Sequence, residues 1–413
     1  MQLTERTRHT RHTRPAAPRA AGPATRQVPA LWPALLAAPA AAGANAPVLI
    51  LPDIAASWGA GTATAAWFVQ AFAWGMAVGT PLAAGLVRLR GPRPALRTSA
   101  ALVLAGTLAL LASPWLPLAL AGRVAQALGA AGLIAVAMGL AGSARRMGAI
   151  TAGFGVLGAT GPLLGSWIGG TTSWRVALAV SLVALAAVPV VDRHAAAGRP
   201  DPGARFDARG AALLLALVTA LVVVPRHPLP ALAAAVPLGV LLALHVRARS
   251  AGFVPVAVLR APGFLPSALL ACALSTSYFT LLFAVPHWLG ERTDWSATAI
   301  GTGQLLALLL GSALSWVLAA ASLRLGHRRV LAVLAGAGVL APLTALTAPW
   351  AALLLPVAAL AVFATTGGNA TLSVRAAGGV GAAHRPAALG LFTLCYQLGG
   401  AFGPALAAVL LYS

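Results

Sequence analysis

Apolar runs of about 20 residues recur along almost the whole of this chain. A helix needs roughly that length to cross the hydrocarbon core of a bilayer, because each residue adds about 1.5 Å. In lipid, every backbone polar group must find its partner within the protein, which favours helices for such runs. Only 8% of the residues are charged, whereas soluble domains carry about 25%. The sequence therefore predicts an all-α, polytopic membrane protein with one integrated bundle.

The apolar runs predict thirteen spans. We place them near residues 31–51, 64–86, 97–112, 116–140, 148–170, 175–191, 209–225, 229–246, 264–289, 298–320, 329–346, 350–372 and 386–411. All 28 basic residues are arginines, and the formal net charge is +21. With the N-terminus in the cytosol, 24 of the 28 fall on the cytosolic side, as the positive-inside rule requires. A bilayer therefore accounts for the charge without a nucleic-acid partner, and we expect a multi-pass protein of the bacterial cytoplasmic membrane.

The span Thr151–Gly170 combines a proline with a row of glycines. Gly161, Gly165 and Gly169 are four residues apart, so they line one face of the predicted helix. Such a face lets a neighbouring helix approach closely, which is how helices associate in lipid. Pro162 removes a backbone donor and weakens the helix at that level. A kinked, tightly packed helix is the simplest interpretation.

The order Gly153, then Gly161-Pro162-x-x-Gly165, resembles the helix-five motif of the 14-helix drug:proton antiporters of the major facilitator superfamily. The family motif ends in two glycines, and the second position here is Ser166. In that family the motif marks exporters. The resemblance implies alternating access of two halves around a site at the membrane midplane.

Two short motifs occur twice, at nearly one offset. Gly91-Pro92-Arg93 matches Gly326-His327-Arg328 at 235 positions, and Gly161-Pro162 matches Gly403-Pro404 at 242 positions. Such repeats are typical of transporters built from related halves. We predict a basic disordered cytosolic tail at 1–28, a six-helix half at 29–191, a linker with an inserted helix pair at 192–262, and a second half of five spans at 263–413. The last helix of that half is expected to be missing, which places the C-terminus outside.

The loop Gly85–Leu96 resembles the superfamily signature between helices two and three. Gly91 and Arg93 match it, whereas Arg88 stands where the signature has an aspartate. The resemblance implies a conformational role for the loop. A turn followed by positive-inside anchors explains the same arginines equally well.

The span near 116–140 carries Arg123 and Gln126 on one face. A charged residue inside a span is costly and should face protein or water. The pair resembles the family's Arg-x-x-Gln-Gly motif, with Ala127 replacing the glycine, and the resemblance implies a role in proton transfer. The alternative is an arginine that snorkels to the outer interface.

The seven acids of the chain all lie in the tail, the loops or at span ends. The 14-helix branch usually has an aspartate early in helix one, and the corresponding position here is Gly43. Arginine does not titrate usefully, so the candidate for coupling is Asp53 at the outer end of the first span. His287 is a weaker substitute.

Polar and aromatic side chains inside the spans are the candidates for a substrate cavity: Asn45, Gln70, Trp74, Tyr278, Gln304 and Gln397. Trp67, Gln70 and Trp74 share one helical face. An aromatic face with few charges suits flat, hydrophobic molecules. Aromatic residues in membrane helices also face lipid or other helices, and that alternative stays open.

These features favour a membrane transporter that exports small, hydrophobic or drug-like molecules, with protons as the second partner. A transport-dead scaffold or sensor and a small-solute importer are the alternatives. We expect no enzyme, cofactor or metal site, because no zinc-protease motif, phosphate-binding loop or flavin signature occurs. Cys272 and Cys395 lie in apolar spans and are expected to be small core residues.

Overall fold

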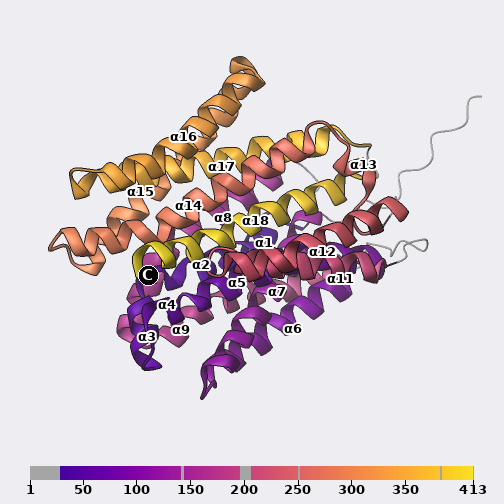
Figure 1. Ribbon diagram of the computed structural model, residues 1–413. Helices are drawn as coiled ribbons and strands as arrows, with labels where there is room; N and C mark the ends of the chain where they lie inside the picture. Colours follow the sequence, from indigo (N-terminus) through magenta and orange to yellow (C-terminus); the bar gives the residue numbers. More distant parts are fainter. Residues whose placement is uncertain (1–27, 141–143, 196–205, 250–251, 382–383, 413) are drawn as a thin grey trace, which may run out of the picture.

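The computed structural model describes residues 28–140, 144–195, 206–249, 252–381 and 384–412, which are helical apart from their connecting turns (Figure 1). Alanine and leucine dominate these segments, and both are strong helix formers. The predicted tail lies almost entirely outside the described residues, as does most of the segment between the spans near 175–191 and 209–225.

The helical elements follow the predicted spans. The first group is α1 (Leu31–Ala37), α2 (Pro39–Asn45), η1 (Ala46–Leu49), α3 (Leu51–Ser57), α4 (Thr62–Ala65), α5 (Trp67–Arg90), α6 (Pro92–Leu111), α7 (Leu116–Gly139), α8 (Ala144–Thr171), α9 (Trp174–Leu178), η2 (Ala179–Ala187) and α10 (Val188–Ala195). The second group is α11 (Ala208–Val223), α12 (Pro228–Ala248), α13 (Val256–Leu259), α14 (Phe264–Arg292), α15 (Ala297–Leu325), α16 (His327–Thr347), η3 (Ala351–Leu353), α17 (Leu354–Gly378) and α18 (Arg385–Tyr412).

Among the described residues, ten helices are long and apolar enough to cross a membrane, or eleven if the bent pair Leu31–Leu49 and Leu51–Ser57 forms one span. The all-α, polytopic fold is thereby confirmed, whereas the predicted number of thirteen spans is not. Helices α8 and α11 occupy two further predicted spans and are not among these ten. Helix α11 is short for a span, with only 16 residues.

Prolines break the first span into four pieces. Pro39 begins α2, Pro47 lies in η1 and Pro52 lies in the first turn of α3. Because proline has no N–H to donate, it is tolerated at a helix start and interrupts the ladder elsewhere. The chain bends by 71° between Leu49 and Leu51, so α3 leaves the direction of the span.

The glycine face of α8 packs directly on this broken span. A Cβ added at Gly161 would lie 2.8 Å from Cβ of Asn45 and 2.9 Å from the carbonyl oxygen of Ala42. At Gly165 it would overlap the carbonyl group of Ala46. Backbone therefore meets backbone here, which is the close approach that the glycine spacing predicts.

The short repeats adopt the same structures in both parts of the chain. Gly91 (φ +87°) joins α5 to α6, and Gly326 (φ +76°) joins α15 to α16. Both turns need a left-handed backbone, which glycine adopts without strain. Gly399 and Gly403 place α18 against the backbone of α14, much as Gly161 and Gly165 place α8 against the first span. The division into two halves with these boundaries stays a prediction.

Helices from the two parts of the sequence meet along two seams. Helix α5 packs on α18, and α8 packs on α15. In Figure 1, α15, α16 and α17 lie on one side of the molecule and α3, α6 and α9 on the other, with α5 and α18 between them. The first part of the chain (28–195) thus meets the second part (206–412) along both seams.

The pair α11 and α12 is held to α5 by polar contacts. Gln70 Nε2 donates to the carbonyl oxygen of Val222 (2.9 Å), and Trp74 Nε1 donates to Thr219 Oγ1 (3.0 Å). Arg226, in the turn between α11 and α12, donates to the carbonyl oxygen of Ala63 (3.0 Å). The pair is therefore docked against the bundle.

Asp207 fixes the other end of this pair. Its carboxylate caps α11 by accepting from the N–H of Gly210 (3.0 Å), and it also accepts from the N–H of Phe253 (3.0 Å) and binds Nε2 of His245 (2.9 Å). Burial raises the pKa of this carboxyl, but these hydrogen bonds outweigh it and lower the pKa to about 2. Asp207 therefore stays ionised at neutral pH and joins α11, α12 and the segment before α14.

We expect Gly161→Leu to lower the thermal unfolding temperature of the purified protein, because the side chain would force α8 away from α2. Gly155→Leu is the matched control, since a Cβ at Gly155 meets nothing within 4 Å on the same helix. Equal unfolding temperatures for the two variants would contradict the packing described here.

Asp207→Ala should destabilise the protein by about 2 kcal/mol, because charge-assisted hydrogen bonds and a helix cap are lost together. The carboxylate's contribution is present above its ordinary pKa and is lost only as the pH falls through about 2. Hydrogen exchange of the amides of Gly210 and Phe253 gives the specific measurement. Asp294→Ala removes an exposed acid and should leave both amides protected.

Candidate functional site

A fully buried arginine lies at the centre of the first part of the bundle. Arg123 on α7 has no exposed surface. Its guanidinium donates to Gln126 Oε1 (3.0 Å), to the carbonyl oxygen of Gly43 (3.1 Å) and, at 3.4 Å, to the carbonyl oxygen of Phe68. It therefore joins α2, α5 and α7 and does not snorkel to the membrane surface.

Gln126 extends this network to two more elements. Its Nε2 donates to Thr107 Oγ1 (2.8 Å) on α6 and to the carbonyl oxygen of Leu178 (3.3 Å). The contact with α6 is possible because a Cβ at Gly106 would lie 2.6 Å from the backbone nitrogen of Gln126. The glycine thus brings the two helices into the range of the hydrogen bond.

The partners of Arg123 are all uncharged. They are carbonyl oxygens, the Gln126 amide and the face of the Phe72 ring, whose centroid lies 4.3 Å from Cζ. The ion pairs in the described part of the chain lie elsewhere, on Asp192, Asp207 and Glu291. Since arginine keeps its proton, the site holds a positive charge that no neighbouring carboxylate offsets.

Asn45 lies where the first span meets both α8 and α14. Its Nδ2 donates to the carbonyl oxygen of Gly158 (2.9 Å). The side chain of Tyr278 on α14 lies next to that of Asn45, and the Tyr278 ring is tilted against the Phe279 ring, with the centroids 4.8 Å apart. The structure therefore brings two of the predicted cavity residues, Asn45 and Tyr278, together at the contact between the two parts of the chain.

The other predicted cavity residues lie apart from that pair. Gln70 and Trp74 use their polar groups to hold α11. Gln304 is fully buried and donates from Nε2 to the carbonyl oxygen of Leu282 (2.9 Å), so it joins α15 to α14. Gln397 on α18 is half-buried. A shared cavity for all six residues stays a prediction.

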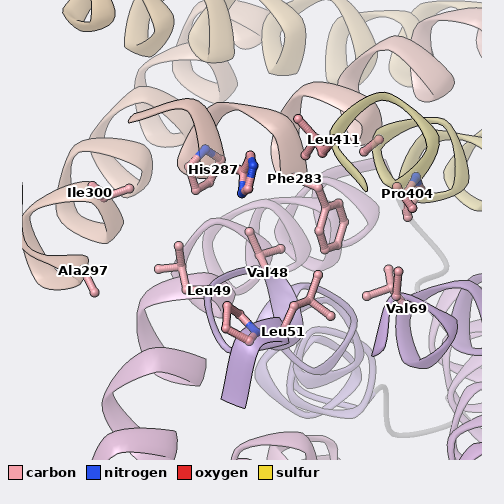
Figure 2. Close-up of a pocket in the computed structure, with 15 residues that line it drawn as sticks. Val48, Leu49, Leu51, Val69, Phe283, His287, Ala297, Ile300, Pro404 and Leu411 are labelled. Atoms are coloured by element: carbon pink, nitrogen blue, oxygen red, sulfur yellow. The ribbon is translucent and has the colours of Figure 1, made fainter. Parts of the chain in front are cut away.

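An apolar cavity of about 180 Å³ separates the broken first span from α14, α15 and α18 (Figure 2). Val48, Leu51 and Val69 face Phe283, Ile300 and Leu411 across it. Sequence analysis did not single out these residues, because a cavity of aliphatic side chains has the same composition as a packed core.

Among the described residues that line this cavity, the titratable side chain is His287. Its Nε2 lies 3.1 Å from Glu291 Oε1 one turn further along α14. Asp53 follows the lining residues Leu51 and Pro52 and is exposed. The coupling role assigned to Asp53 stays a prediction.

The loop motif forms a charge cluster that sequence analysis did not anticipate. Arg93 and Arg97 at the start of α6 bind the same carboxylate, Asp192 of α10, at 3.1 and 2.9 Å. The positive φ of Gly91 sets the turn that directs α6 toward α10. Asp192 is the acid directly after the predicted sixth span, and it is the sequence signal that could have pointed to this partner.

The apolar helices, the seams between them and the buried polar network together define a multi-pass helical membrane protein. A family model described as "Major Facilitator Superfamily" matches residues 31–404, and the chain belongs to this family. An uncharacterized MFS-type transporter, from two strains of Mycobacterium tuberculosis, is 28% identical over 303 residues. The match covers 66% of this chain and 43% of the relative, so the chain spans less than half of that protein's length.

Solved transporters share the fold at low sequence identity. The POT family transporter PepTSo superposes with a TM-score of 0.65 at 18% identity, over 93% of this chain and 90% of that one. The human organic anion transporter MFSD10 superposes with a TM-score of 0.62 at 17% identity, over 94% of each chain. These similarities establish the fold.

We expect Arg123→Ala to abolish transport while the protein remains in the membrane. The change leaves the acceptors on Gln126 and Gly43 without their donor inside a sealed site and opens a cavity, which should cost about 2–4 kcal/mol of stability. Arg329→Ala, which removes an exposed arginine on α16, is the control. Normal substrate flux through a well-expressed Arg123→Ala variant would contradict a role in transport.

Proposed function

We propose that this protein exports small, hydrophobic or drug-like molecules from the bacterial cytosol by alternating access, with its N-terminus in the cytosol. The observation that carries the proposal is the position of α8. Its glycine face packs on the first span, and the same helix contacts α15 in the second part of the chain. The helix that bears the exporter-like Gly-Pro motif therefore lies on a seam that alternating access would open and close.

Two further features support this assignment. The cavity beside the seam is lined by aliphatic side chains, Phe283 and His287, which suits apolar molecules. The polar pair Asn45 and Tyr278 lies outside the lining of this cavity, at the contact between the two parts, and offers the few directional groups that a site of this kind needs. The proposed substrate class follows from this combination.

Substrate accumulation tests the proposal directly. Cells that express the protein should retain less of a fluorescent apolar dye than cells with an empty vector, and Gly161→Leu should remove the difference. Greater dye retention would indicate an importer. Equal retention across a panel of dyes, with the protein shown to be in the membrane, would favour an inert scaffold.

Proton antiport is the energy source that we propose, from the Arg123–Gln126 pair that resembles the antiporter motif. We expect Asp53→Asn to keep substantial activity, because the carboxylate is exposed on the bent helix α3 and lies outside the Arg123 network. Efflux driven by an imposed pH gradient in vesicles measures this. Complete loss of gradient-driven efflux at normal expression would instead make Asp53 the proton site.

A further inference from the structure

We propose that the protein selects anionic over cationic substrates, because the centre of its membrane-embedded part carries one positive charge that no carboxylate in the described part of the chain offsets. This inference rests on the proposed function and specifies its substrate class as apolar molecules that bear a carboxylate or a similar anionic group. Arg123 is the source of the charge, and the contact between Asn45 and Tyr278 is the place where a substrate senses it.

The buried charges of the described residues support this selectivity. Among the described residues, the buried charged side chains are Arg123 and Asp207. Asp207 lies at the start of α11, and its carboxylate is hydrogen-bonded by His245 and two backbone N–H groups. The remaining buried polar side chains are neutral amides, hydroxyls and a phenol. The net charge of the buried centre is therefore positive.

The surroundings of Arg123 do not cancel this charge. Its hydrogen bonds end on two carbonyl oxygens and on an amide oxygen, which stabilise the guanidinium without neutralising it. A low-dielectric interior lets such a charge act over a longer distance than water would. A cation that approaches the site loses its hydration and meets repulsion, whereas an anion is attracted.

Arg123 lies close enough to the contact between Asn45 and Tyr278 for its charge to change the affinity of a substrate bound there. Arg123 binds the carbonyl oxygen of Gly43, and Asn45, two residues further along the same span, lies beside Tyr278. By the dimensions of a helix, the guanidinium lies on the order of 10 Å from the contact between Asn45 and Tyr278. At an effective dielectric constant of about 20, a unit charge at this distance changes affinity about tenfold.

Two xanthene dyes of similar size test the proposal: anionic fluorescein and cationic tetramethylrhodamine ethyl ester. The flux of each dye down its own gradient into proteoliposomes needs no assumption about the energy source, and protein-free liposomes give the passive leak. We expect the protein to favour the anion at least about tenfold in flux. Equal fluxes of both dyes above the passive leak, or a preference for the cation, would overturn the proposal.

Gln126→Glu changes the charge with little change in shape. Its carboxylate would replace an amide oxygen that already lies 3.0 Å from Arg123 Nη1, and the adjacent guanidinium would keep it ionised. We expect the preference for the anion to fall to threefold or less. Gln126→Met is the matched control, because it removes the same hydrogen bonds without adding charge, and it should keep the tenfold preference. Identical ratios for the two variants would overturn the proposal.

Binding to the purified protein separates this inference from the proposed function. Fluorescence polarisation gives the Kd of each dye without transport. If neither dye crosses the vesicles but fluorescein binds about tenfold more tightly, the selectivity stands and the export function fails. If both dyes bind equally, or neither binds, the selectivity fails. Thermal unfolding of each variant shows that the compared proteins are folded.

Discussion

Close backbone contact through glycine is the constraint on which the rest of this structure depends. In lipid there is little hydrophobic drive between helices, so packing and internal hydrogen bonds must hold the bundle together. Gly161 and Gly165 bring α8 onto the first span, and Gly403 brings α18 onto α14. Gly106 brings α6 onto α7 in the same way. Glycine thus makes close helix contacts in both parts of the chain.

The buried polar network exists because these contacts are so close. Thr107 reaches Gln126 only since Gly106 removes the spacing that a side chain would impose. Gln126 then orients one side of the guanidinium, while the carbonyl oxygens of Gly43 and Phe68 hold the other. Once enclosed, Arg123 is an electrostatic feature of the interior, and the proposed preference for anions would follow from this packing.

The pair α11 and α12 shows how an added element is accommodated in such a bundle. Gln70 and Trp74 on α5, together with Arg226 and Asp207 at the two ends of the pair, supply hydrogen bonds at several levels. Because lipid offers no competing donors or acceptors, each bond has an orienting effect. The polar-aromatic face of α5 is therefore turned to α11.

The sequence by itself determined the helical membrane class, the positions of the helices and the glycine face of α8, because these follow from local length, polarity and spacing. It also pointed to Arg123 and Gln126, since a charge inside an apolar run stands out. Only the tertiary structure decided which groups surround them. The Gly43 and Leu178 carbonyls, Asp192 as the partner of Arg93, and the aliphatic cavity beside Phe283 come from segments far apart in the chain. Backbone carbonyls and aliphatic side chains carry no distinctive sequence signal, so the places where they meet are decided by three-dimensional packing.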